Sequence, residues 1–101
     1  MNAISTSQSK PDPVGDAVNT VAVGTLIIRP PTDYEWIIHN IYHVSDATLD
    51  LITPSGTISA IDTDIGAGLW ARYAFHVTNT YYLQVRSSST IVADGVVSKT
   101  P

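Results

Sequence analysis

The sequence predicts an all-β domain, and three observations support this fold class. About a third of the 101 residues are Val, Ile or Thr, whose β-branched side chains fit a pleated sheet and lose freedom in a helix. Short apolar runs alternate with turn residues along the chain. No segment has helical periodicity. We therefore expect an antiparallel β-sandwich with a jelly-roll-like topology and about seven to eight short strands.

Two parts of the chain differ in composition. Residues 1–17 are polar, contain Pro11, Pro13 and Gly15, and lack a periodic apolar pattern, so they predict an extended N-terminal arm. Residues 18–101 predict the β-sandwich domain. The N-terminus has no apolar run of the length that a signal peptide or membrane span needs. We expect a chain without a signal peptide or membrane contact, assembled in the cytoplasm of the cell that makes it.

The strands are expected in a regular order along the domain. The run "TVAV" and, after Gly24, the run "TLIIR" predict one or two strands that end before Pro30. The longest run is "YEWIIHNIYHV". "TLDLIT" and "TISAID" flank Pro54 and Gly56, which favour a type I turn and hence a hairpin. "DTDIGAG" predicts a loop, and the last three strands are "LWARYAFHV", "YYLQVR" and "TIVADGVV".

Charge and cysteine content exclude several classes of function. Charged residues make up 14% of the chain, and the net charge is −4 with only 5 Lys and Arg. These basic residues are scattered and do not match a row of phosphates, so we expect no nucleic-acid partner. The chain has no cysteine, which excludes disulfides and thiolate metal sites. The fold must therefore be held by packing, or by packing and association.

His39 and His43 have the spacing that metalloprotease helices use to bind zinc. On a strand this spacing separates the two residues by about 13 Å, whereas zinc ligands approach the ion to about 2.1 Å. Asn40 also stands where the metalloprotease motif needs Glu. We expect ordinary strand histidines on the polar side of a sheet and no metal. Convergence of these histidines and His76 with Asp50 or Asp62 stays open as an alternative.

Other candidate chemistry is sparse. Asp62 and Asp64 are alternate carboxylates, as in a calcium loop, but Gly66 stands where an EF-hand has Asp or Asn and the distal Glu is missing. Asp and Gly are also the usual residues of a tight connection, which is the interpretation that we favour. No nucleophile elbow or phosphate loop occurs, and nothing places two carboxylates across a cleft. We expect no enzymatic activity and no cofactor.

Aromatic and aliphatic side chains give the strongest functional indication. Strict alternation along the longest run places Ile37 and Ile41 on the face opposite Ile38. Apolar side chains on both faces of a small sheet suggest that one face meets a partner. Trp and Arg are favoured at the centre of interfaces, so Trp70 and Arg72 join this set. We expect Ile37, Ile41, Trp70 and Arg72 at a subunit interface. The alternative is that Trp70 covers one end of the sandwich.

Three segments together, "DYEWIIHNIYHV", "YAFHVTNTYYLQVRS" and "IVADGVVSK", resemble small accessory virion proteins of tailed bacteriophages, of the head-decoration or cement type. The resemblance covers roughly residues 34–99. It implies a sandwich or jelly-roll body, a homotrimer on a capsid lattice, and an arm that reaches along neighbouring subunits. The partners would be copies of the chain itself and the major capsid protein or another virion protein. The expected lattice contacts of the arm are Ile4, Lys10, Pro11, Pro13 and Val14.

A carbohydrate-binding module of a phage receptor-binding or tail apparatus is the alternative function. Sugar binding needs exposed aromatic platforms with Asp or Asn nearby. Trp70 beside the "DTDIGAG" segment would supply such a platform. This hypothesis requires that the Trp70 ring be exposed.

Overall fold

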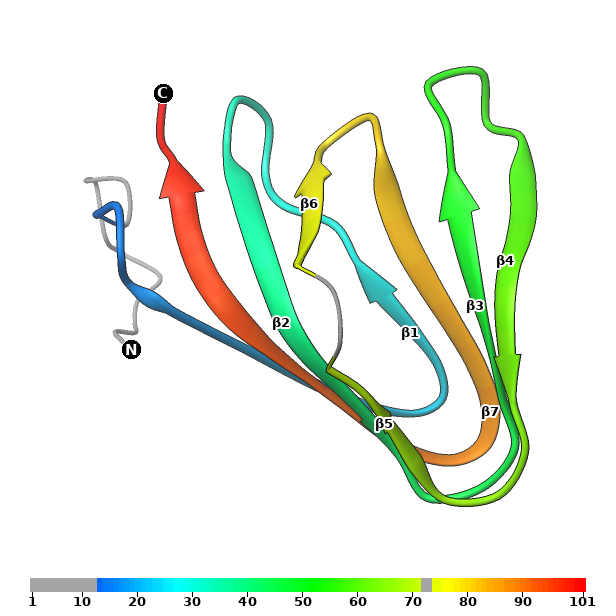
Figure 1. Cartoon of the computed structure of the whole chain (residues 1–101). Helices are drawn as coiled ribbons and strands as arrows, with labels where there is room; N and C mark the ends of the chain where they lie inside the picture. Colours follow the sequence, from blue (N-terminus) through cyan, green and yellow to red (C-terminus); the bar gives the residue numbers. More distant parts are fainter. Residues whose placement is uncertain (1–12, 72–73) are drawn as a thin grey trace.

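The computed structural model describes residues 13–71 and 74–101, and these residues form one curled antiparallel sheet of seven strands (Figure 1). The all-β fold class is thus confirmed, and the described residues contain no helix. The strands are β1 (Ala17–Ile28), β2 (Glu35–His43), β3 (Ala47–Ile52), β4 (Ile58–Asp64), β5 (Gly68–Trp70), β6 (Phe75–Thr78) and β7 (Tyr82–Lys99).

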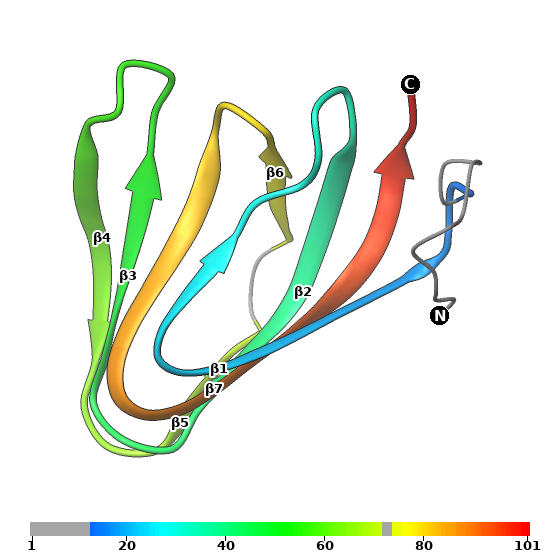
Figure 2. The ribbon, with the colours of Figure 1, turned by 180° about the vertical axis from the view of Figure 1, so that it is seen from behind.

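The sheet is folded along one line, which we call the crease. β1 and β7 both cross it, and the chain also passes it between β2 and β3 and between β4 and β5 (Figures 1 and 2). In β1 the crease lies at Gly24, where the register to β7 shifts, and the φ angle of Gly24 is +93°, a conformation that favours glycine. Before the crease β7 pairs with β3, and after the crease it pairs with β2.

The crease divides the sheet into two parts. The first half-sheet contains β2, β5, β6, the start of β1 and the end of β7. The second half-sheet contains β3, β4, the end of β1 and the start of β7. Inward side chains of both halves form one apolar core. Burial of these side chains holds the two half-sheets together. The core residues are Val18, Leu26, Ile28, Ile38, Ile41, Ala47, Leu49, Trp70, Val77, Leu83, Val85, Ile91, Ala93 and Val97.

A β-bulge changes the alternation of side chains in β2. Ile38 pairs with Gly95 of β7 and Asn40 pairs with Asp94, so His39 is an extra residue in β2. As a result Ile38 and Ile41, three positions apart, both point into the core. Gly95 lies opposite the bulge because a Cβ atom there would overlap the carbonyl oxygen of Ile37.

The structure has seven strands, which agrees with the predicted number, but several strands begin or end at other residues than predicted. The hairpin around Pro54 is confirmed: β3 pairs with β4, and Gly56 N donates to Thr53 O at 2.8 Å. The predicted loop at residues 62–68 is wrong in its first half, because β4 continues to Asp64. The predicted strand at residues 69–77 is interrupted between β5 and β6. The predicted final two strands are one continuous strand, β7.

The boundary of the predicted arm differs from the attachment point in the structure. Residues 1–12 lie outside the described residues, so the arm itself remains an expectation. Gly15 N donates to Val97 O at 2.7 Å, and Val97 N donates to Asp16 O at 2.9 Å. These bonds join the chain to the end of β7 two residues before β1 begins.

Candidate interaction surface

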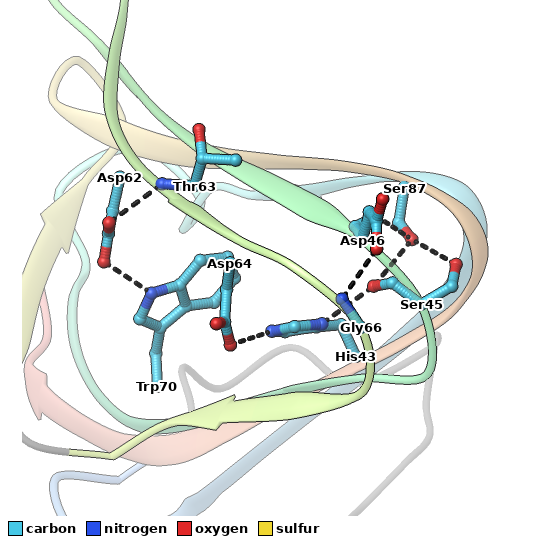
Figure 3. A network of polar contacts seen from close by, with 9 residues as sticks. All are labelled: His43, Ser45, Asp46, Asp62, Thr63, Asp64, Gly66, Trp70 and Ser87. Carbon is cyan, nitrogen blue, oxygen red and sulfur yellow. Dashed lines mark hydrogen bonds and ion pairs between the residues drawn. The ribbon is translucent and has the colours of Figure 1, made fainter.

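A network of polar contacts crosses the crease and holds most of the residues that suggested chemistry in the sequence (Figure 3). His43, at the end of β2, is completely buried. Its Nδ1 lies 2.8 Å from the carbonyl oxygen of Ser45, and its Nε2 lies 2.8 Å from Oδ2 of Asp64. A carbonyl only accepts hydrogen bonds, so Nδ1 carries a proton. Nε2 and the Asp64 carboxyl group lie at hydrogen-bond distance.

Gly68 makes room for this pair. It is the first residue of β5 and lies opposite His43 in the register. A Cβ atom at this position would overlap Oδ2 of Asp64 and would lie 3.0 Å from Cε1 and Nε2 of His43. The final glycine of "DTDIGAG" is therefore required by the packing of the crease.

Trp70 is bound at the same crease. Trp70 is buried, with 9% of the residue exposed, and its ring lies 4.8 Å from the ring of His43, centroid to centroid, with the planes tilted by 45°. Its Nε1 donates to Oδ2 of Asp62 at 2.8 Å, while Oδ1 of Asp62 accepts from Thr63 N at 2.9 Å. The platform required for sugar binding is therefore not available at Trp70.

Further hydrogen bonds tie the two connections of the crease together. Oδ1 of Asp46 accepts from Gly66 N at 2.6 Å, which joins the β2–β3 connection to the β4–β5 connection. Ser87, at the bend of β7, donates from Oγ to the carbonyl oxygen of Asp46 at 2.8 Å. The network thus fixes three neighbouring segments where they change direction.

The carboxylates of the crease are bound by protein groups. Asp62 and Asp64 lie on one strand but bind different donors, Trp70 and His43. Within residues 13–71 and 74–101, no group of three or more His, Asp or Glu side chains is placed to hold a metal ion. The geometry is that of a structural network in which each carboxylate serves a protein donor.

The histidines are separated by the fold. His39 is exposed at the bulge of β2, whereas His43 is buried in the crease. The expectation that His43 lies on a polar face is therefore wrong, because the bulge reverses the side of the strand on which it lies. His76, on β6, is exposed, and its Nδ1 lies 2.9 Å from Oε2 of Glu35. Asp50 contacts none of them.

The residues predicted for a subunit interface do not lie on one surface. Ile41 and Trp70 belong to the core, so their predicted place on an exposed face is wrong. Ile37 is half-buried on the outer face, as expected. Arg72 lies outside the described residues. Of the predicted arm contacts, Pro13 and Val14 are exposed, and the other three, Ile4, Lys10 and Pro11, lie outside the described residues.

The structure reveals a different apolar surface, which we call the outer row. The register of the first half-sheet places Val21, Val92, Tyr42 and Leu69 side by side across β1, β7, β2 and β5. All four alternate with inward residues and therefore point outward. Val21 is 66% exposed, Leu69 54% and Tyr42 45%, and Val92 is half-buried. At a strand spacing of about 4.8 Å, the outer row spans about 14 Å.

The outer face of the second half-sheet is mixed: Ile27 of β1 and Ile58 of β4 are exposed, and a polar cluster around Asp50 lies on the strands between them. Asp50, on β3, is fully buried beneath the side chains of β7. It accepts hydrogen bonds from Nε of Arg86 at 2.7 Å, from Nη2 of Arg86 at 3.0 Å and from Nε2 of Gln84 at 3.0 Å. Hydrogen bonding to the Arg86 guanidinium lowers the pKa of Asp50 below its ordinary value, although burial opposes this shift. Nearby, the guanidinium of Arg29 lies 4.5 Å from the ring centre of Tyr82.

A hollow of about 320 Å³ lies at the open end of the fold, away from the crease. Its lining is almost entirely polar, and one of its two carboxylates, Glu35, is bound by His76. Such a volume lies at the low end of small-molecule sites. The lining residues are Thr32, Asp33, Tyr34, Glu35, Thr78, Asn79, Thr80 and Lys99.

Comparison of the sequence with family models and curated proteins adds no relative. The chain matches no protein-family model and no curated protein sequence. Among the described residues, no helix has the length and apolar character needed to cross a membrane. The interpretation of the chain therefore rests on its own surfaces.

Proposed function

We propose that this protein is a structural virion component that decorates or cements a capsid lattice as a homo-oligomer. The observation that carries the proposal is the contrast between the two outer faces of the sheet. The first half-sheet exposes the outer row, which is continuous across four strands, whereas the second half-sheet has a polar network around the buried Asp50 and exposes Ile27 and Ile58 as separate apolar side chains. The resemblance to head-decoration proteins supplies the capsid as the setting and a trimer as the assembly.

The free edge of β1 supports association as the role of this surface. Among the described residues, β1 pairs only with β7, and its segment "AVNTVAVGTLII" contains no charged residue and no proline. Soluble proteins usually protect an edge strand with charge, proline or a cover. Exposed apolar side chains beside an unprotected edge are typical of an interaction site. The surfaces are thus suited to binding protein.

The jelly-roll body belongs to this proposal. Two observations support it: the half-sheets share one apolar core, and the connections between β1 and β2 and between β6 and β7 cross the open end (Figure 1). Such a body is rigid, because both halves share the core and the network at the crease. A rigid body of this kind suits a protein that binds an assembled lattice.

The physical advantage of such a protein is linkage. A protein that binds an assembled lattice but not its free subunits stabilises the lattice by mass action. Oligomerisation strengthens this effect, because each bound copy holds its neighbours at high local concentration over the lattice. The arm would add contacts that become ordered on docking.

Co-sedimentation with empty capsid shells of the phage that encodes the chain tests this proposal. We expect the full chain to sediment with the shells at saturable stoichiometry, and a chain lacking residues 1–12 to bind more weakly. This deletion leaves the bonds of Gly15 and Asp16 to Val97 intact. If the full chain stayed in the supernatant, the decoration role would be wrong. Equal binding of the shortened chain would remove the arm from the proposal.

A further inference from the structure

The outer row has a defined border on the sheet. On one side, the next row toward the crease contains Val23 of β1, Thr90 of β7 and Val44, which donates from N to Thr90 O at 3.3 Å. Val23 and Val44 are both exposed and extend the apolar surface. We call these side chains and the outer row together the outer patch.

A polar row closes the outer patch on its other side. Asn19 of β1 pairs with Asp94 of β7, which pairs with Asn40 of β2. Nδ2 of Asn40 donates to Oδ1 of Asp94 at 2.9 Å. An apolar centre bordered by polar side chains is the usual anatomy of a protein interface.

We propose that the outer patch is the surface by which two copies of this chain contact each other. This inference rests on the homo-oligomer in the proposed function and assigns one of its contact surfaces. Because the outer patch meets its own counterpart, this contact forms a dimer, and a trimer requires a second, different contact. The patch itself carries no charged side chain, and the carboxylate of Asp94 at its border is bound by Asn40. A nucleic acid or an anionic lipid surface would require Lys or Arg here. A basic protein would require a cluster of carboxylates.

A second copy matches this surface in charge and in chemistry. The chain has a net charge of −4, so two copies repel each other except where their contact is neutral. The outer patch provides such a contact. The amides of Asn19 and Asn40 both donate and accept hydrogen bonds, so the polar border of one copy can pair with that of another. Face-to-face sheets pack about 10 Å apart, which allows Tyr42 and Leu69 to interdigitate with their counterparts.

Sedimentation equilibrium of the full chain and its lysine variants tests this contact. We expect the unmodified chain to associate, and we expect Val21→Lys and Leu69→Lys to weaken association by at least about tenfold, because each buries a charge in an apolar contact. Ile27→Lys is the matched control, since Ile27 lies on β1, is 45% exposed and faces outward from the second half-sheet. The control should associate like the unmodified chain. Circular dichroism would verify that each variant is folded.

Cross-linking provides a second measurement that requires no buried charge. The chain has no cysteine, so a short bismaleimide reacts only at an introduced thiol. We expect Tyr42→Cys to give covalent dimers and Ile27→Cys to associate without forming a covalent dimer. The contact would be disproved if the unmodified chain were monomeric at about 100 µM, a concentration that detects weak dimers. It would also be disproved if the control variants lost association while Val21→Lys and Leu69→Lys kept it.

The two proposals fail independently. A chain that associates through the outer patch but does not bind capsid shells supports this contact and disproves decoration. A monomeric chain that binds shells, and loses that binding on Leu69→Lys, supports decoration and disproves the contact between copies. In that case the capsid protein would occupy the outer patch.

Discussion

His43 and Asp64 are joined at 2.8 Å across the crease, from the end of β2 in one half-sheet and the end of β4 in the other. The ring of His43 is completely buried, and its second nitrogen is bound by the carbonyl of Ser45. Both nitrogens of a buried imidazole are therefore satisfied by segments of the crease itself. The pair connects two strands that are not paired with each other in the sheet.

Removal of the Asp64 carboxylate should destabilise the fold. Asp64→Ala leaves Nε2 of a buried ring without its partner, and we expect the free energy of unfolding to fall by about 1–3 kcal/mol. Asp64→Asn should lose less, because its amide nitrogen can donate to Nε2. Urea unfolding measures both, with the exposed neighbour Thr63→Ala as the control. If Asp64→Ala unfolded at the same urea concentration as the control, the pair would not stabilise the crease.

Acid should weaken the second half-sheet through Asp50. Arg86 lowers the pKa of Asp50 from its ordinary value of 3.8, so the folded state prefers the ionised carboxylate. The stability that this provides is complete above the ordinary pKa and is lost as the pH falls through the lower, folded value. We expect the unmodified chain to have a higher Tm than Asp50→Asn near pH 7. This difference should vanish in strong acid, as thermal unfolding across the acid range would show. A difference that persisted unchanged at low pH would contradict the assignment.

The sequence predicts strands well here because their signals are local. β-Branched runs mark the strands, and Pro54 with Gly56 marks the β3–β4 hairpin, which the structure confirms. Gly24 separates two apolar runs in the sequence. That both runs form one strand bent at Gly24 follows from their pairing with β7, which the local sequence does not show. A contact that spans distant segments, such as that of His43 with Asp64, leaves no local pattern.

The faces of β2 could not be predicted because one inserted residue reverses them. Strict alternation assigned Ile41 to an outer face, whereas the bulge at His39 turns it into the core. Tyr42 then points outward and joins the outer row. Leu69 and Val77 also face different sides, since Leu69 is exposed and Val77 is buried, because the chain is interrupted between β5 and β6. The expectation of apolar side chains on both faces is met by Ile37, as predicted, and by Tyr42, which the prediction placed on the other face.

Calcium should not alter the stability of the isolated chain. In the crease, Asp62 binds Trp70 and the Thr63 amide, and Asp64 binds His43, so a cation at these carboxylates would have to displace protein donors. We expect the same Tm in calcium and in a chelator. A saturable rise of Tm with calcium would show that the folded state binds the ion. Loss of that rise in Asp62→Asn would then identify the site as the crease and restore the calcium-dependent interpretation.

Gly95→Ala should damage the bulge that sets the faces of β2. A Cβ atom at Gly95 would overlap the carbonyl oxygen of Ile37, which is backbone and cannot move without shifting β2. We expect a loss of at least about 3 kcal/mol in the free energy of unfolding, at the upper end of overpacking costs. Gly56→Ala is the comparison, because no atom lies within 4 Å of its Cβ position and only its φ of +85° opposes the substitution. This second loss should be about 1–2 kcal/mol. Urea unfolding would rank the two, and the bulge would not depend on Gly95 if both variants lost the same stability.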